Sequence, residues 1–100
     1  MNQDPCVVVA VFRGRPGREQ ALAAALRQMC IPSRDEPGCI NYDLHASAID
    51  PGEFFFHETW ASADDHRVHL DSPHVRHLLT ITPDMLREPI QEFKGTRVAA

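Results

Sequence analysis

The sequence lacks clustered basic residues and long apolar runs, and each absence argues against one class of binding partner. Its 10 lysines and arginines are outnumbered by 14 acidic residues, so the net charge is −4 with neutral histidines. Because phosphate binding needs clustered Lys and Arg, we expect no nucleic acid partner. The apolar runs at residues 6–12 and 53–60 are too short to span a bilayer, and the N-terminus has no signal-peptide pattern. We therefore expect a cytoplasmic protein with no membrane partner.

Signatures of cofactor and metal binding are also missing. No GxGxxG or Walker pattern occurs, so neither a flavin nor a nicotinamide cofactor is expected. The three cysteines, Cys6, Cys30 and Cys39, are odd in number and have no CxxC spacing. We interpret each as a small buried apolar residue, with a reactive thiol at Cys39 as the alternative.

The chain has the length of one domain, residues 1–100, and its first third predicts a strand and a helix. Residues 6–12 are rich in valine and end at a turn that contains Gly and Pro. From Arg18 onward, apolar residues recur at helical spacing. Pro32 either ends this helix near Ile31 or bends it for one more turn, to Arg34.

The middle of the chain predicts an antiparallel strand pair. Residues 39–47 and 53–61 flank the turn Asp50-Pro51-Gly52, in which Pro and Gly favour a tight reversal. Alternation along the first of these strands predicts two faces. Ile40, Tyr42, Leu44 and Ala46 share one face, and Cys39, Asn41, Asp43 and His45 share the other.

Two short helices and a last strand complete the predicted order. Ser62 caps a helix that ends near Leu70, and Ser72 caps a second one that begins at Pro73 and ends before Thr82-Pro83. Residues 89–98 alternate as a strand with one wet face.

These elements predict an α+β, ferredoxin-like β-α-β-β-α-β fold, with a four-stranded antiparallel sheet and a split second helix. The helices cover one face of the sheet. The other face carries partly apolar positions such as Phe55 and Thr59. We expect a homodimer through sheet-to-sheet packing to cover that face.

Three sequence blocks resemble the antibiotic biosynthesis monooxygenase family: EPGCINYDLH at 36–45, DPGEFFFHETWAS at 50–62 and HLDSPHVRHL at 69–78. The resemblance implies a dimeric α/β barrel. Members include cofactor-free quinol and polyketide oxygenases, an isomerase of a small phosphorylated signalling molecule, and haem-degrading enzymes. The haem degraders use an Asn, a Trp and an iron-ligating His. In this sequence the first strand has no Asn, His69 stands at the position of the Trp, and Leu79 stands at the position of the iron-ligating His. Haem binding is therefore not expected.

The third strand offers the first candidate site residues. Phe56, Glu58 and Trp60 share one of its faces, and the family resemblance implies that the Glu-x-Trp pair faces the helices. Glu58 would then orient a histidine and raise its basicity. Tyr42 and Asn41 are candidates to hydrogen-bond a substrate oxygen, although their opposite strand faces allow only one of them to do so.

The histidines offer the candidate base. The resemblance implies that His69 and His74 cover the pocket, and His74 lies in a first helical turn, where the positive dipole end favours a neutral imidazole. Helix capping and packing is the alternative role for both. His66 and His77 are expected to be exposed on their helices, whereas His45 and His57 alternate onto the opposite face of the strands.

A metal site is not predicted. His69 and His74 lack a third ligand at a known spacing, because the pattern that joins them to His66 is interrupted by Pro73.

We therefore expect a cofactor-independent monooxygenase that oxidises a small aromatic phenol or quinol with dioxygen. His69 or His74 would be the base, Glu58 its partner, and Trp60, Phe56 and Tyr42 the holders of the ring. One alternative is an isomerase of a small hydroxyketone or phosphorylated molecule, with a basic residue such as Arg13 or Arg76 at the ligand. Another is a non-catalytic dimer that binds a small ligand.

Overall fold

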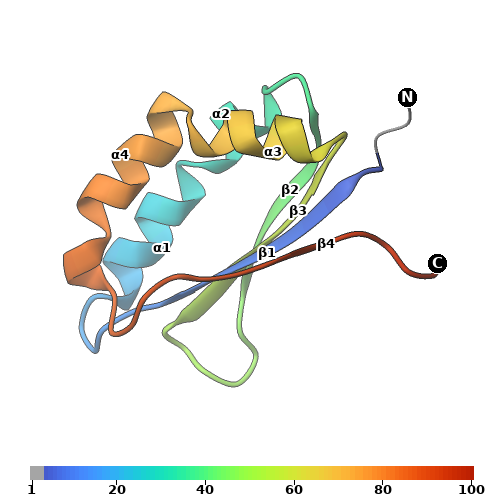
Figure 1. Cartoon of the computed structure of the whole chain (residues 1–100). Coiled ribbons are helices and arrows are strands. Elements are labelled where there is room, and N and C mark those ends of the chain that lie inside the picture. The colour runs from blue at the N-terminus through green and yellow to red at the C-terminus, as the bar shows by residue number, and fades with distance from the viewer. Residues whose placement is uncertain (1–3) are drawn as a thin grey trace.

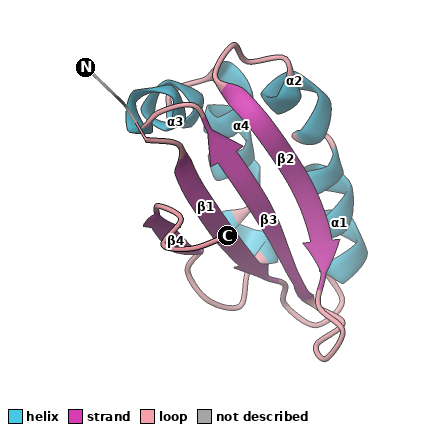
Figure 2. Cartoon of the chain, turned by 90° about the vertical axis from the view of Figure 1, so that its right-hand side faces the viewer, coloured by secondary structure: helices cyan, strands magenta, loops and turns pink. Residues whose placement is uncertain are grey.

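A computed structural model of the chain, which describes residues 4–100, contains one four-stranded sheet with helices on one face (Figures 1 and 2). The strand order is β2-β3-β1-β4, and all neighbouring strands are antiparallel. Figure 2 shows the strands in front of the helices, with the near face of the sheet left open. The ferredoxin-like plan predicted from the sequence is confirmed.

The central strands β1 (Cys6–Arg13) and β3 (Glu53–Trp60) carry the hydrophobic core. In their register Val8 lies opposite Glu58 and Ala10 opposite Phe56, so these side chains project toward the helices. The edge strands are β2 (Cys39–Ala46), which pairs with β3, and β4 (Gln91–Gly95), which pairs with β1. Among the described residues, the structure has no helix long and apolar enough to pass through a bilayer.

The first helical segment is divided at the place where proline predicts a break. Helix α1 (Glu19–Arg27) ends before Gln28, and the short helix α2 (Cys30–Arg34) contains Pro32. Proline has no N–H and its ring crowds the carbonyl four residues earlier, which belongs to Gln28. The second of the two predicted outcomes, a bend followed by one further turn to Arg34, is therefore correct.

The second helical segment is split as predicted into α3 (Ala63–Leu70) and α4 (Pro73–Ile81), followed by the 3₁₀ turn η1 (Pro83–Met85). Ser62 Oγ accepts a hydrogen bond from Asp65 N at 3.1 Å, and Ser72 Oγ accepts one from Val75 N at 3.4 Å. Each serine satisfies an N–H group at a helix start that would otherwise lack a partner.

The predicted alternation along β2 is wrong at its start. A β-bulge shifts the register between Cys39 and Asn41. As a result, Cys39 packs against the core, whereas Ile40 is 59% exposed, although Ile40 was assigned to the face of the buried Tyr42. A bulge adds one unpaired residue and so reverses the two faces on one side of it.

We predict that a side chain at Gly38 would disturb the contact between the α2–β2 connection and α3. A Cβ there would lie 2.2 Å from Asp65 Cγ, and Asp65 is held by the Ser62 cap. Gly38→Ala should therefore lower the free energy of unfolding by about 1–3 kcal/mol, the usual cost of overpacking. The matched control is Gly95→Ala, whose Cβ would meet no atom within 4 Å. Equal stabilities of the two variants in urea unfolding would contradict this account.

Candidate functional site

A buried carboxylate at the middle of the sheet is the first component of the candidate site. Glu58 projects from β3 toward the helices between Phe56 and Trp60, and its residue is only 3% exposed. The Trp60 indole Nε1–H donates a hydrogen bond to Glu58 Oε1 at 2.9 Å. This bond anchors one carboxylate oxygen, as a buried polar group requires.

Glu58 faces a cavity of about 310 Å³ between the sheet and helices α3 and α4. The volume is at the lower end of the range for small-molecule pockets. Its polar lining residues are Tyr42, Glu58, His66, His69 and Glu92. Its apolar lining residues are Ala10, Phe12, Met29, Phe56, Leu70, Val75, Leu78, Leu79 and Ile90.

Helix α3 contributes two histidines to this cavity. His66 and His69 are three residues apart, so they lie on the same helix face, and both are buried. Glu58 Oε1 lies 4.0 Å from His66 Nε2 and 3.9 Å from His69 Nε2. These distances exceed hydrogen-bond length, so His69 Nε2 is available to a ligand in the cavity. The His69 ring is held against the Trp60 indole, with centroids 4.5 Å apart.

The other nitrogen of His69 is bound by a different carboxylate. His69 Nδ1 lies 2.7 Å from Glu36 Oε2, and His74 Nε2 lies 2.9 Å from the same oxygen. Glu36 stands in the connection between α2 and β2, and His74 stands in the first turn of α4. When Nδ1–H donates to Glu36, the lone pair of His69 is fixed on Nε2, toward the cavity. Glu36, and not Glu58 as the sequence predicted, is the hydrogen-bonded carboxylate partner of His69.

Burial governs the protonation of the cavity groups. Desolvation raises the pKa of Glu58 to about 7, against the opposing effect of the Trp60 hydrogen bond. Desolvation also lowers the pKa of His66, to about 4, and that of His69, for which the bond to Glu36 acts in the opposite direction. The histidines are therefore neutral near pH 7, and Glu58 can take up or release a proton there.

The remaining sequence candidates occupy different places. Tyr42 and Phe56 lie together in the cavity wall, with ring centroids 4.5 Å apart. Trp60 is fully buried behind His69. Asn41 lies on the outer face of the sheet, where its side-chain amide donates to the backbone oxygen of His57 at 3.0 Å, so it does not reach the cavity.

Among the residues that the sequence did not identify as part of the site are His66 and Glu36. His66 was expected to be exposed, but it is 1% exposed and its Nδ1 has no hydrogen-bond partner among residues 4–100. Its i,i+3 spacing to His69 was the available signal. Glu36 was interpreted only as part of a turn. No local pattern marks it, because its partners His69 and His74 lie 33 and 38 residues away.

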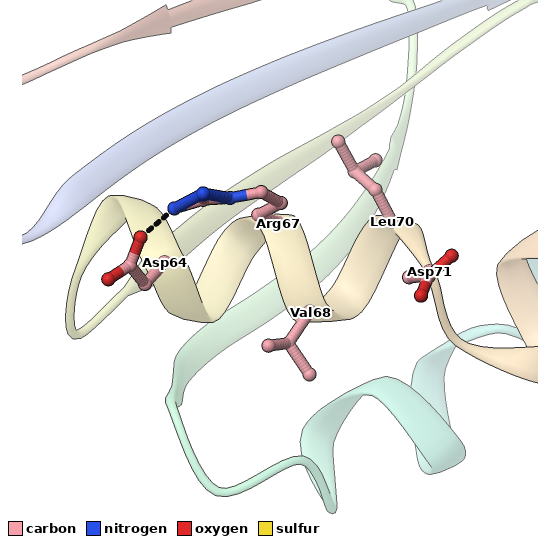
Figure 3. Close-up of a pocket in the computed structure, with 5 residues that line it drawn as sticks. All are labelled: Asp64, Arg67, Val68, Leu70 and Asp71. Carbon is pink, nitrogen blue, oxygen red and sulfur yellow. Dashed lines mark ion pairs between the residues drawn. The ribbon is translucent and has the colours of Figure 1, made fainter.

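A second hollow, on the solvent side of α3, is wider but lacks buried polar groups. Figure 3 shows its lining residues, with Asp64 paired to Arg67 and with Val68 projecting from another side of the helix than Leu70. The volume there is about 680 Å³, but the space is open to solvent, and Val68 is 64% exposed. Because ligand recognition needs convergent polar groups, we place the candidate site in the smaller cavity, which is less open to solvent and is lined by the buried Glu58, His66 and His69.

We predict that Glu58 and His66 compensate each other in the pH dependence of stability. Between pH 4.5 and 6.5, the pair binds one proton in either state: on Glu58 in the folded protein and on His66 in the unfolded one. Because the number of bound protons does not change on unfolding, the pair adds no pH dependence to stability. Glu58→Gln leaves only the histidines, whose lowered pKa values make stability rise with pH. Between pH 4.5 and 6.5, the free energy of unfolding of this variant should rise by up to about 3 kcal/mol more than that of the wild type. His66→Gln should show the opposite slope. Parallel urea-unfolding profiles for all three proteins would contradict the compensation.

Residues 5–80 match the family described as antibiotic biosynthesis monooxygenase. The chain is 38% identical over 89 residues to "Putative monooxygenase Rv0793" of Mycobacterium tuberculosis, which covers 86% of this chain and 84% of that protein. It is 29% identical over 96 residues to "Uncharacterized protein sll1783" of Synechocystis, and it spans 65% of the length of that relative.

Solved structures agree with this assignment. The structure of Rv0793 superposes with a TM-score of 0.91, at 33% identity over 97% of this chain and 98% of that one. The structure of PA3566 from Pseudomonas aeruginosa superposes with a TM-score of 0.92, at 27% identity over 99% of both chains. The family match over residues 5–80, together with these relatives, shows that the chain belongs to the antibiotic biosynthesis monooxygenase family.

Proposed function

We propose that this protein is a cofactor-independent monooxygenase that oxidises a small quinol-type aromatic molecule with dioxygen. The observation that carries the proposal is the Glu36–His69 pair, which fixes one imidazole nitrogen and leaves the other free beside the cavity. A non-catalytic binding site has no need of an oriented base, so the same observation favours an enzyme over a ligand carrier.

The proposed reaction needs no external reductant. A hydroquinone and one dioxygen give a hydroxyquinone and one water, so one oxygen atom enters the ring and the other leaves as water. The substrate supplies all four electrons, two from the quinol and two from the ring C–H bond that becomes C–OH. Deprotonation starts the reaction, because the quinolate gives up electrons to dioxygen more readily than the neutral quinol. The protein must therefore supply a base and an enclosed apolar space.

His69 is the proposed base. Its Nε2 would take the proton of the substrate hydroxyl, and Glu36 would stabilise the resulting imidazolium through the Nδ1–H bond of 2.7 Å. His74 does not line the cavity. It lies 2.9 Å from the same Glu36 oxygen, and its side chain is 21% exposed. His74 would thus donate a second hydrogen bond to Glu36 and hold its carboxylate in position for His69.

The cavity chemistry suits a neutral aromatic ring. Tyr42 and Phe56 offer an aromatic wall whose ring planes differ by 33°, and burial raises the pKa of Tyr42, so its hydroxyl stays a donor. Glu58, whose pKa of about 7 is near the pH at which the protein would work, would return a proton to the reduced oxygen.

The lining of the cavity argues against a phosphorylated substrate. Among residues 4–100, no Arg or Lys lines it. Arg13 is paired with Glu53, and Arg76 is paired with Asp71 at the surface. A phosphate group would also meet the carboxyl groups of Glu58 and Glu92. These observations favour the oxygenase over the isomerase.

A second copy of the chain is the proposed cover of the outer sheet face. That face carries Val7, Val9 and Val11 of β1, Phe55 of β3 and Phe93 of β4, which lies opposite Val9 and is 55% exposed. An apolar face of this kind favours self-association, and two sheets packed on one another would form the dimeric α/β barrel.

We predict that His69→Gln lowers kcat/KM for a hydroquinone by about 100-fold or more, because general-base catalysis contributes at least that factor. Glu36→Gln should lower it by about 10- to 100-fold, as expected for loss of an orienting partner. The exposed His77→Gln, one turn into the same helix as His74, is the control and should retain wild-type activity.

The measurement is oxygen uptake above the spontaneous rate, with labelled dioxygen to show one labelled atom in the hydroxyquinone. Full turnover by the His69→Gln variant would remove the base assignment.

We also predict that Val9→Lys disrupts the proposed dimer, because it places a charge at the centre of the apolar outer face. Light scattering after size exclusion should show a dimer for the wild type and a monomer for the variant. Ala24→Lys, on the exposed side of α1, is the control and should remain a dimer. A monomeric wild type would overturn the proposed assembly.

A further inference from the structure

We propose that Glu36, His69 and His74 form a binding site for a divalent transition-metal ion such as Zn²⁺, and that the bound ion switches off the base. The donor atoms are Glu36 Oε2, His69 Nδ1 and His74 Nε2, and they all lie within 4.8 Å of one another. Two imidazoles and one carboxylate are a common protein ligand set for such ions, with solvent in the remaining positions.

The geometry requires only a small expansion to admit the ion. The Glu36 oxygen lies 2.7 Å from the His69 nitrogen and 2.9 Å from the His74 nitrogen. Around a tetrahedral Zn²⁺ with bonds of about 2.1 Å, donor atoms are about 3.4 Å apart. These two distances must therefore lengthen by about 0.5–0.7 Å, and Glu36 can supply the movement because it stands in a connection between α2 and β2 and not inside a helix or strand.

The cluster also has the surroundings of a binding site. His69 is buried and held against Trp60, whereas the side chains of Glu36 and His74 are 13% and 21% exposed, so an ion has an access route from solvent. Ser72 Oγ lies 3.2 Å from His74 Nε2 and donates to the backbone oxygen of His69. Ser72 thus fixes the turn that carries both histidines, as outer-shell partners do in metal sites.

Metal binding and base catalysis exclude each other because a neutral imidazole carries one proton. In the hydrogen-bonded state, His69 donates Nδ1–H to Glu36, and Nε2 has the lone pair. An ion bound to Nδ1 needs the lone pair of that nitrogen, so the proton of Nδ1 must move to Nε2. Nε2 then faces the cavity as a donor and cannot accept the substrate proton. This inhibitory half rests on the proposed function, whereas the binding half does not.

The test of binding uses tag-free protein freed of metal with a chelator. Calorimetric titration with Zn²⁺, and the visible absorption of Co²⁺, should show one ion per chain in the wild type and in His77→Gln. Glu36→Gln and His74→Gln should bind more than about 10-fold more weakly, because each replaces one of the three direct ligands and outer-shell changes alone cost that much. Equal binding by all four proteins, or no binding by the wild type, would overturn the site.

The test of switching has a structural and a kinetic readout. Nitrogen-15 NMR of the imidazoles should show the His69 proton on Nδ1 without metal and on Nε2 with Zn²⁺. Zn²⁺ should inhibit oxygen uptake in proportion to site occupancy, and chelator should restore it. Binding that leaves both the tautomer and the rate unchanged would overturn the switch. If no quinol is oxidised at all, the proposed function fails, and the calorimetric and NMR results still decide the site.

Discussion

The hydrogen bond between Glu36 and His69 is the contact on which the candidate site depends. It joins the α2–β2 connection to α3, and it determines which imidazole nitrogen faces the cavity. Without it, His69 would be free to present either nitrogen, and the neutral ring would lose its fixed donor and acceptor ends. Because His74 binds the same carboxylate oxygen, this contact is also part of the only three-ligand cluster found among residues 4–100.

The buried polar groups of the cavity are stabilised by hydrogen bonds and by remaining largely uncharged, and not by ion pairs. Glu58 is held by the Trp60 indole and remains partly protonated near neutral pH, while His66 and His69 stay uncharged. Three ionisable groups can therefore occupy one apolar layer without the desolvation cost of three charges. The same restraint keeps a proton donor and a proton acceptor within 4 Å of each other, which is the requirement for moving protons in an enclosed space.

Local patterns were sufficient for the fold, because caps, proline and alternation act over a few residues. Ser62, Ser72 and Pro32 mark the helix boundaries found in the structure, and the Glu58–Trp60 pair faces the helices as expected. The site was only partly predictable. Glu36 contacts histidines that lie more than 30 residues away in the sequence. His66 is buried against the sheet, which the pattern of its own helix cannot show. The bulge after Cys39 turns the side chain of Ile40 to the opposite face of the sheet. Each miss depends on a contact between segments distant in sequence.

Strand β4 gives the cavity one wall of low local stability. It has five residues, all exposed, and it pairs only with β1, yet it carries Glu92 into the lining. Opening this edge breaks a single strand ladder and uncovers little apolar surface, so its free energy is far below that of global unfolding. Of the four strands, β4 is therefore the one that we expect to detach first, and its detachment would open the cavity on the Glu92 side without any movement of the helices that carry His69 and His74.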